Sequence, residues 1–274
     1  MPFKLSDLDE TQSPLLEHLI ELRGRLVKAV LALLVAFAVC FYFADEIFGF
    51  LVRPLTRAFP DGEGQLIYTK LYEAFFVEVK VALFAAFFVA FPIIANQLWQ
   101  FVAPGLYAKE KRAFLPFMIA TPILFTLGGA LAYFVVMPLA FTWFLDFQGD
   151  AGGLNAQALP AMGDYLDLVM RFILAFGISF LLPVLLMLLN GAGLVTRDQF
   201  VSARRYVIVA VFAVAAIITP PDVISQIMLA APLLLLFEGS LVLMMLSERK
   251  RAKEAAAADT AAESETADPA KDEG

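Results

Sequence analysis

The stretch LVKAVLALLVAFAVCFYF, residues 26–43, carries a single charged side chain, Lys28, and is the clearest indicator of the fold. A helix needs about 20 predominantly apolar residues to cross the hydrocarbon core of a bilayer, which is about 30 Å thick. The composition agrees, because 61% of the 274 residues are hydrophobic and 17% are charged, whereas soluble domains are about 45 to 50% apolar. These observations exclude a soluble enzyme domain and a disordered chain, and they predict a membrane protein.

Five further apolar runs follow, so the sequence predicts an all-α, polytopic protein with six transmembrane helices. The further runs cover approximately residues 74–98, 113–144, 165–189, 206–219 and 223–237. Prolines inside the third and fourth of the six runs predict tilted or kinked helices. The last two runs are short, because Pro220 and Pro221 end one and Glu238 ends the other. Either these two helices continue through polar flanks, or the bilayer thins around them.

The basic residues gather in alternate loops. If the amino terminus is cytoplasmic, most of the 20 Lys and Arg residues lie in cytoplasmic segments, and the loop from Asp146 to Asp164 has none. Short loops on the cytoplasmic side of a membrane carry an excess of Lys and Arg. The sequence therefore predicts a multi-pass membrane protein with both termini in the cytoplasm.

Composition divides the chain into residues 1–253, a six-helix transmembrane domain, and residues 254–274, a tail rich in Ala and acidic residues. Such a tail buries too little apolar surface to offset the entropy of ordering, and we expect it to be disordered. The acidic start of the chain predicts no cleavable signal peptide. With one cysteine, Cys40, and one histidine, His18, we expect no disulfide, multi-histidine zinc site or other cofactor, and no nucleic-acid partner.

One segment with charged residues precedes the first predicted crossing, and another lies between the second and the third. In HLIELRGRL, residues 18–26, Glu21 and Arg25 are four apart and predict an ion pair on one helix face. In FVAPGLYAKEKR, residues 101–112, Glu110 is a single carboxylate among three cations. Both glutamates can have a purely structural role, as a salt bridge and as a neutralising charge. Glu110 could also accept paired hydrogen bonds from the arginine of a ligand.

Polar residues within or beside the apolar runs are the other candidates. Thr219-Pro220-Pro221-Asp222 predicts a tight hairpin in which Asp222 caps the next helix. Gln226 follows Asp222 on the same helix face, and an unpaired amide at membrane depth is costly. Asp167 and Arg171 have the spacing of an ion pair, whereas Glu238 and Tyr133 lie inside apolar runs and could be functional or structural.

In order along the chain, these segments resemble the TatC family, the polytopic core subunits of the twin-arginine, Sec-independent protein translocase. The resemblance covers about residues 14–245. It rests on HLIELRGRL, FVAPGLYAKEKR, GGALAYFVVMPLAF, YLDLVMRFILAFGISFLLPV and ITPPDVISQ. It implies a cup-shaped, six-helix receptor, not an enzyme, that binds twin-arginine signal peptides of folded proteins. It also implies TatA and TatB as single-span partners, self-association in the bilayer, and export driven by the proton-motive force.

The resemblance assigns roles to particular residues. It implies that Glu21, Arg23 and Glu110 form the signal-binding surface. It further implies that a polar cluster for partner helices maps to Tyr133, Thr219, Asp222 and Gln226. One departure is Leu181, which stands where many relatives have Glu or Gln.

The alternative function is that of a secondary transporter of a small solute, with Glu238 and Glu78 as proton or ion sites. An intramembrane protease is disfavoured, because the sequence lacks a serine–histidine, paired-aspartate or zinc motif.

Overall fold

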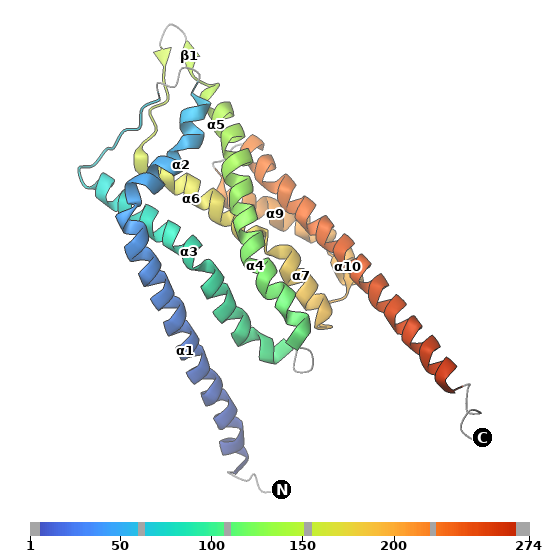
Figure 1. Ribbon diagram of the computed structural model, residues 1–274. Helices are drawn as coiled ribbons and strands as arrows, with labels where there is room; N and C mark the ends of the chain where they lie inside the picture. Colours follow the sequence, from blue (N-terminus) through green and yellow to red (C-terminus); the bar gives the residue numbers. More distant parts are fainter. Residues whose placement is uncertain (1–5, 60–63, 107–110, 151–154, 220–222, 267–274) are drawn as a thin grey trace, which may run out of the picture.

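The computed structural model describes residues 6–59, 64–106, 111–150, 155–219 and 223–266, which form a bundle of long helices (Figure 1). The chain ends lie at one end of the bundle, and the β1–β2 hairpin lies at the other. In chain order the elements are α1 (Ser6–Tyr42), α2 (Ala44–Ala58), α3 (Glu73–Leu106), α4 (Lys111–Leu131), η1 (Ala132–Val136), α5 (Met137–Leu145), β1 (Gly149–Asp150), β2 (Asn155–Ala156), α6 (Met162–Ser179), α7 (Leu182–Gly191), α8 (Arg197–Ser202), α9 (Arg204–Ile218) and α10 (Val223–Thr266).

The structure confirms the all-α class, since its only strands within the described residues are the two-residue pair β1 and β2. Within the same residues, five helical segments are long and apolar enough to cross a membrane: His18–Tyr42, Glu73–Phe101, Leu115–Leu145, Met162–Gly191 and Val223–Lys250. The predicted fifth crossing corresponds to α9, which has 15 residues. At 1.5 Å per residue α9 is about 22 Å long, as short as the sequence indicates.

The carboxyl-terminal helix α10 is longer than the sixth apolar run. Of the two alternatives for this short run, continuation through polar flanks is confirmed, because α10 continues past Phe237 and Glu238 pairs with Arg204 at 2.7 Å. The last residue assigned to α10 is Thr266, within a segment rich in alanine, the strongest helix former. The disorder of the tail stays a prediction. Residues 267–274 lie outside the described residues.

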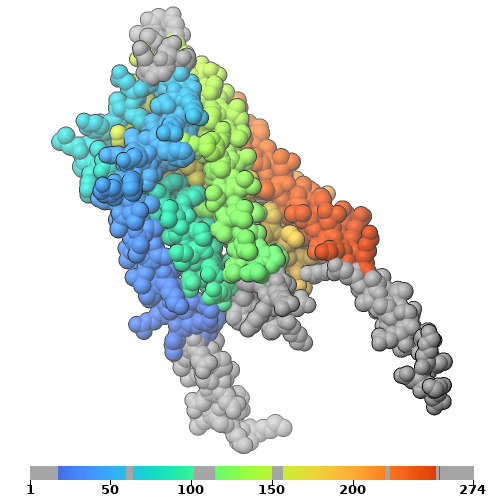
Figure 2. Space-filling model, in the orientation of Figure 1, coloured from blue at the N-terminus to red at the C-terminus, as the bar shows by residue number. Residues whose placement is uncertain are grey.

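Close helix packing depends on small side chains. α1 meets α3 through Ala36 and Cys40 on one side and Ala82, Ala86 and Ala90 on the other, all buried. Small residues let helix backbones approach closely in a membrane, where there is no hydrophobic driving force between helices. In Figure 2 the surfaces of α1, α3 and α4 accordingly lie side by side, and α10 forms the opposite edge.

Glycines have the same role between α4 and α6. A Cβ atom on Gly128 would lie 2.4 Å from the carbonyl oxygen of Phe176. A Cβ atom on Gly177 would lie 2.7 Å from the ring of Phe125. The two helices are therefore fixed at a separation that excludes any side chain at these positions.

The third and fourth crossings are broken near their prolines, in agreement with the predicted kinks. The π-helical turn η1 interrupts the third crossing just before Pro138, and α6 gives way to α7 just before Pro183. Such π-bulges are local departures from the regular α-helical hydrogen-bond pattern.

Helix α2, which the sequence analysis did not predict, lies at the end of the bundle opposite the termini (Figure 1). It buries Leu51 and Leu55, and the hydroxyl groups of Tyr133 and Tyr165 donate to the carbonyl oxygens of Phe50 and Leu51 at 2.6 and 2.9 Å. Two buried tyrosines from the third and fourth crossings thus hold α2 against the bundle.

The two loops beside α2 are joined through Glu73. One carboxylate oxygen accepts from the backbone N–H of Thr69 at 2.8 Å, and the other accepts from the backbone N–H of Gly163 at 2.9 Å. Next to this contact, the N–H of Ile67 donates to the carbonyl of Pro160 at 3.1 Å, and the N–H of Met162 donates to the carbonyl of Ile67 at 2.7 Å. The loop before α3 and the loop before α6 therefore form one connected cap.

Candidate functional site

Glu21 lies on α1 at the end of the bundle that carries the termini. The guanidinium Nε of Arg25 donates to Oε1 of Glu21 at 3.0 Å, so the structure confirms the predicted pair. The side chain of Arg25 is 19% exposed and that of Glu21 is 39% exposed. The cation is therefore largely covered, while part of the carboxylate remains open to solvent.

Helix α3 holds the other side of Arg25. Its Nη1 donates to the amide oxygen of Gln100 at 2.8 Å, and the amide nitrogen of Gln100 donates to Asn96 at 2.9 Å. The planar guanidinium thus bridges a carboxylate on α1 and an amide on α3. This geometry fixes the orientation of Oε1 of Glu21.

Among the described residues, the second carboxylate oxygen, Oε2, has only a long contact, 3.7 Å to Nδ1 of His18. The His18 ring stacks on Phe101 of α3, with ring centroids 4.2 Å apart and an interplanar angle of 16°. The sequence analysis missed Gln100, Asn96 and Phe101. The polar pair Asn96 and Gln100, four residues apart at the end of an apolar run, was the only available signal.

Arg23 is exposed on α1, where the apolar side chains of Ile20, Leu22 and Leu26 are 70%, 40% and 60% exposed. Glu110 lies outside the described residues, in the segment between the end of α3 at Leu106 and the start of α4 at Lys111. The described part of the site therefore presents the carboxylate of Glu21, the exposed guanidinium of Arg23 and exposed apolar side chains of α1.

The predicted intramembrane cluster is distributed over two places. The buried Tyr133 lies in η1, and its ring stacks on Phe50 of α2 with a centroid separation of 4.4 Å. Thr219 donates to the carbonyl of Ala215 at 2.9 Å, and Gln226 of α10 donates to the carbonyl of Phe212 of α9 at 3.0 Å. Asp222 lies outside the described residues. Within them, no hydrogen bond joins Tyr133 to Thr219 or Gln226.

The predicted pair of Asp167 with Arg171 is wrong. Asp167 instead accepts two hydrogen bonds from Nζ of Lys80 on α3, at 2.8 and 3.1 Å. The packing of α3 against α6 brings a point charge directly opposite the carboxylate. Helical spacing alone gave no information about this neighbour.

The contacts of Glu238 and Leu181 fit a structural role for both residues. Glu238, with a 49% exposed side chain, is in an ion pair with Arg204 of α9, which is the ordinary role considered for it. Leu181 is partly buried against the cluster of Phe91, Ala95 and Phe125. An apolar side chain at this position is therefore accommodated by apolar neighbours.

Comparison with known proteins gives one consistent result. The family model "Sec-independent protein translocase protein (TatC)" matches residues 17–232. The Sec-independent protein translocase protein TatC of Magnetococcus marinus is 49% identical over 211 residues, which cover 77% of this chain and 76% of that protein. The TatC protein of Aquifex aeolicus is 40% identical over 209 residues, covering 76% of this chain and 85% of that protein.

A solved structure agrees with the sequence comparisons. The crystal structure of the twin-arginine translocase receptor TatC in DDM is 40% identical to this chain and superposes with a TM-score of 0.74. The match covers 83% of this chain and 99% of that chain.

Proposed function

Because this chain belongs to the TatC family and is a multi-pass subunit of the Sec-independent protein translocase, we propose that it is the receptor of that translocase for twin-arginine signal peptides. The observation that carries the proposal is the half-open carboxylate of Glu21. Arg25 and Gln100 fix Oε1, and Oε2 remains accessible beside His18.

The chemistry of Glu21 suits an arginine-bearing ligand. A guanidinium presents planar N–H donors that match a carboxylate, whereas a lysine ammonium is a point charge. A second guanidinium can approach Oε2 from the exposed side while Arg25 keeps Oε1. Exposed ion pairs contribute little by themselves, and the exposed Ile20, Leu22 and Leu26 supply apolar contact for the hydrophobic part of a signal peptide. Glu110 would provide the second carboxylate and Arg23 an adjoining cation.

We further propose that α9 and α10 receive single-span partners of the TatA and TatB type. Gln226 already bonds to the carbonyl of Phe212, and an amide retains a further donor and its oxygen for a neighbouring helix. Asp222 would join Gln226 in meeting such helices, while the buried Tyr133 and Thr219, which bond to the carbonyl oxygens of Phe50 and Ala215, would support the polar cluster from within the bundle. Self-association of the chain and cargo transport driven by the proton-motive force are part of this proposal.

The topology belongs to the same proposal. The excess of Lys and Arg in the loops at the end that carries the termini favours a cytoplasmic location for both termini in the bacterial inner membrane. Glu21 would then face the cytoplasm, where a signal peptide arrives attached to folded cargo.

Glu21→Gln tests the receptor function. It keeps the shape of the side chain and removes its charge, so we expect crosslinking of a twin-arginine peptide to residues near position 21 to fall about tenfold. A twin-lysine peptide should crosslink weakly to the unmodified protein. The matched control is Asp198→Asn, which neutralises a carboxylate that is 95% exposed on α8. Unchanged crosslinking in a folded Glu21→Gln protein, or equal labelling by the two peptides, would refute the proposal.

A further inference from the structure

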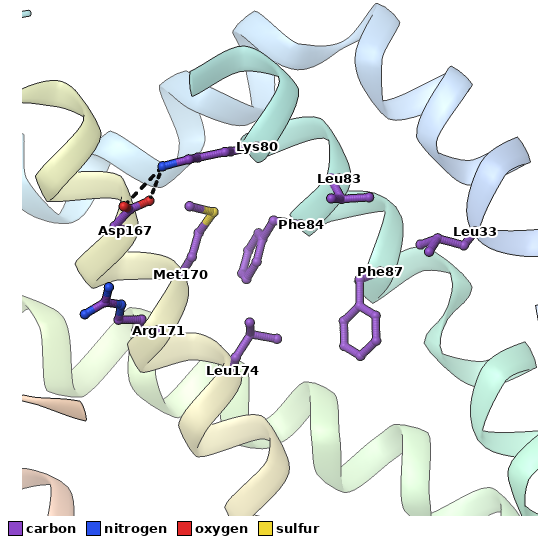
Figure 3. A pocket seen from close by; sticks show the side chains of 9 residues that line it. All are labelled: Leu33, Lys80, Leu83, Phe84, Phe87, Asp167, Met170, Arg171 and Leu174. Atoms are coloured by element: carbon purple, nitrogen blue, oxygen red, sulfur yellow. Dashed lines mark hydrogen bonds and ion pairs between the residues drawn. The ribbon is translucent and has the colours of Figure 1, made fainter. Parts of the chain in front are cut away.

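A hollow of about 510 Å³ lies between α3 and α6, away from the residues assigned above (Figure 3). Leu83, Phe84 and Phe87 of α3 form one wall, and Leu174 of α6 lies opposite them. Such a volume is typical of small-molecule sites. The hollow therefore combines an apolar interior with the three charged residues at its edge, Lys80, Asp167 and Arg171.

The edge of the hollow carries one excess positive charge. Lys80 and Asp167 neutralise each other through the two contacts shown as dashed lines in Figure 3. The exposed guanidinium of Arg171 lies on the Asp167 side of α6 and points away from the apolar side chains of Phe84 and Phe87. Within the part of the chain that the structure describes, Arg171 has no hydrogen bond or ion pair. A cation inside a membrane-spanning helix is stabilised when it faces an anion or reaches the polar interface.

With each span centred in the hydrocarbon core, the position of the cations along their helices places them just inside the boundary of that core. The span Glu73–Phe101 has 29 residues, about 43 Å, and exceeds the hydrocarbon thickness by about 6 Å at each end. Lys80 is about 10 Å from the start of that span, and Arg171 about 13 Å from the start of the span at Met162. Both are a few ångströms inside the hydrocarbon, and their long side chains can extend to the headgroups.

The size of the hollow favours a lipid over a protein helix. A helix with side chains is 10 to 12 Å across, so a volume of this size encloses only about one turn of it. An acyl chain is narrow enough to lie along Leu83, Phe84 and Leu174. A phosphodiester carries one negative charge, which matches the excess charge at the edge.

We infer that this hollow is a specific site for an anionic phospholipid of the leaflet opposite the termini, with its phosphate bound by Arg171 beside Lys80. Its acyl chain lies on the apolar wall between α3 and α6. The inference is independent of signal-peptide binding, because neither Glu21 nor the α9–α10 hairpin contributes to the hollow.

Native mass spectrometry of the full chain in detergent tests this site with defined additions. The additions are phosphatidylglycerol, phosphatidylcholine, diacylglycerol and glycerol 3-phosphate. We expect phosphatidylglycerol to be retained most strongly, and Arg171→Gln to weaken its retention about tenfold. Leu83→Trp should also release the lipid, because Leu83 is 50% exposed and a larger ring there fills the hollow without changing a charge. The matched control is Arg57→Gln, which removes an exposed arginine on α2 at the same end of the molecule.

Four results would overturn the inference. Equal loss of lipid in Arg171→Gln and Arg57→Gln would show that retention follows overall charge. Retention of diacylglycerol equal to that of phosphatidylglycerol would remove the role of the phosphate. Displacement of the lipid by equimolar glycerol 3-phosphate would identify a free-phosphate site. A photocrosslinker at position 83 that reacts in native membranes with a protein helix and not with phospholipid would identify a different occupant.

Discussion

The two carboxylate oxygens of Glu21 have different surroundings, and this difference bears on what the residue can do. Oε1 is held by Arg25, which Gln100 of α3 holds in turn, while in the described part of the chain Oε2 has only the long contact to His18. An i,i+4 pair on a helix surface contributes about 0.2 to 0.5 kcal/mol. The pair is therefore a minor term in stability, and its main effect is to orient the carboxylate.

Gln100→Leu tests this positioning. Removing the amide leaves Arg25 free to move, so Glu21 loses its fixed orientation and twin-arginine peptide binding should weaken about threefold. The change in the midpoint of thermal unfolding should be small because Gln100 is exposed. Peptide binding is measured by fluorescence anisotropy, and twin-arginine and twin-lysine peptides should become harder to distinguish.

Gln97→Leu is the matched control, an amide on the same helix that is not part of the chain of contacts to Glu21. A similar loss of binding in both variants would indicate a general effect of polarity at the end of α3. The positioning role of Gln100 would then be rejected.

The residue pairs show what sequence can and cannot predict. The Glu21–Arg25 pair followed from spacing, because both residues lie on one continuous helix. Gln100 is 75 positions from Arg25, and no local pattern indicates which helix faces α1. The same limit explains Asp167, whose spacing indicated Arg171 although Lys80 lies 87 positions away. Contacts between helices depend on packing, which local periodicity does not encode.

At the scale of elements, hydrophobic runs predicted the long helices well, because membrane thickness sets their length. They failed for α2, whose apolar residues are interrupted by Asp45, Glu46 and Arg53. That helix depends on tertiary contacts, above all on the hydroxyl groups of Tyr133 and Tyr165 that bond to its backbone. Tyr133, which the sequence left as either functional or structural, has its hydroxyl bonded to the carbonyl of Phe50.

Tyr133→Phe should therefore loosen α2. The change removes one hydrogen bond and leaves the carbonyl of Phe50 without its partner, a loss of about 1 kcal/mol. Hydrogen exchange of the α2 amides should accelerate, and more so in a double variant with Tyr165→Phe. Tyr42→Phe is the control because Tyr42 is 82% exposed. Equal exchange rates in the Tyr133→Phe and Tyr42→Phe proteins would contradict the anchoring role.

Gly128→Ala tests the contact between α4 and α6. The added methyl group would overlap the carbonyl of Phe176, which the helix backbone cannot move away, so we expect a destabilisation of about 1 to 3 kcal/mol. The midpoint of thermal unfolding in detergent measures it. Gly239→Ala on α10 meets nothing within 4 Å and should be neutral or stabilising by up to about 1 kcal/mol. Equal midpoints for the two variants would refute the close packing of α4 on α6.

At the scale of the whole molecule, the crossings differ in length. The span on α3 has 29 residues and α9 has 15, so these two helices match bilayers of different thickness. The cost of such a mismatch is a fraction of a kcal/mol per ångström, and the bilayer adapts by thinning. A thinned region beside α9 would lower the barrier to moving polar groups across the membrane.

Spin labels can measure this thinning. Labels at Val209 and Ile217 of α9, which are 68% and 80% exposed, should both be close to water-soluble relaxation agents. A label at Val89 in the middle of α3, 65% exposed, is the reference for normal depth. We expect the α9 labels to be shallower than the reference. If Val209 or a neighbouring position is as deep as Val89, the bilayer has its normal thickness there and the prediction is wrong.

The cap joined by Glu73 restrains how the bundle can respond to a ligand. It ties the start of α3 to the start of α6 by backbone hydrogen bonds, and the buried tyrosines fasten α2 beside it. The opposite tip, where Glu21 and Gln100 lie, is joined between α1 and α3 by the hydrogen bond from Arg25 to Gln100. A separation of these two helices there would break that bond and leave the hydrogen bonds of the cap in place.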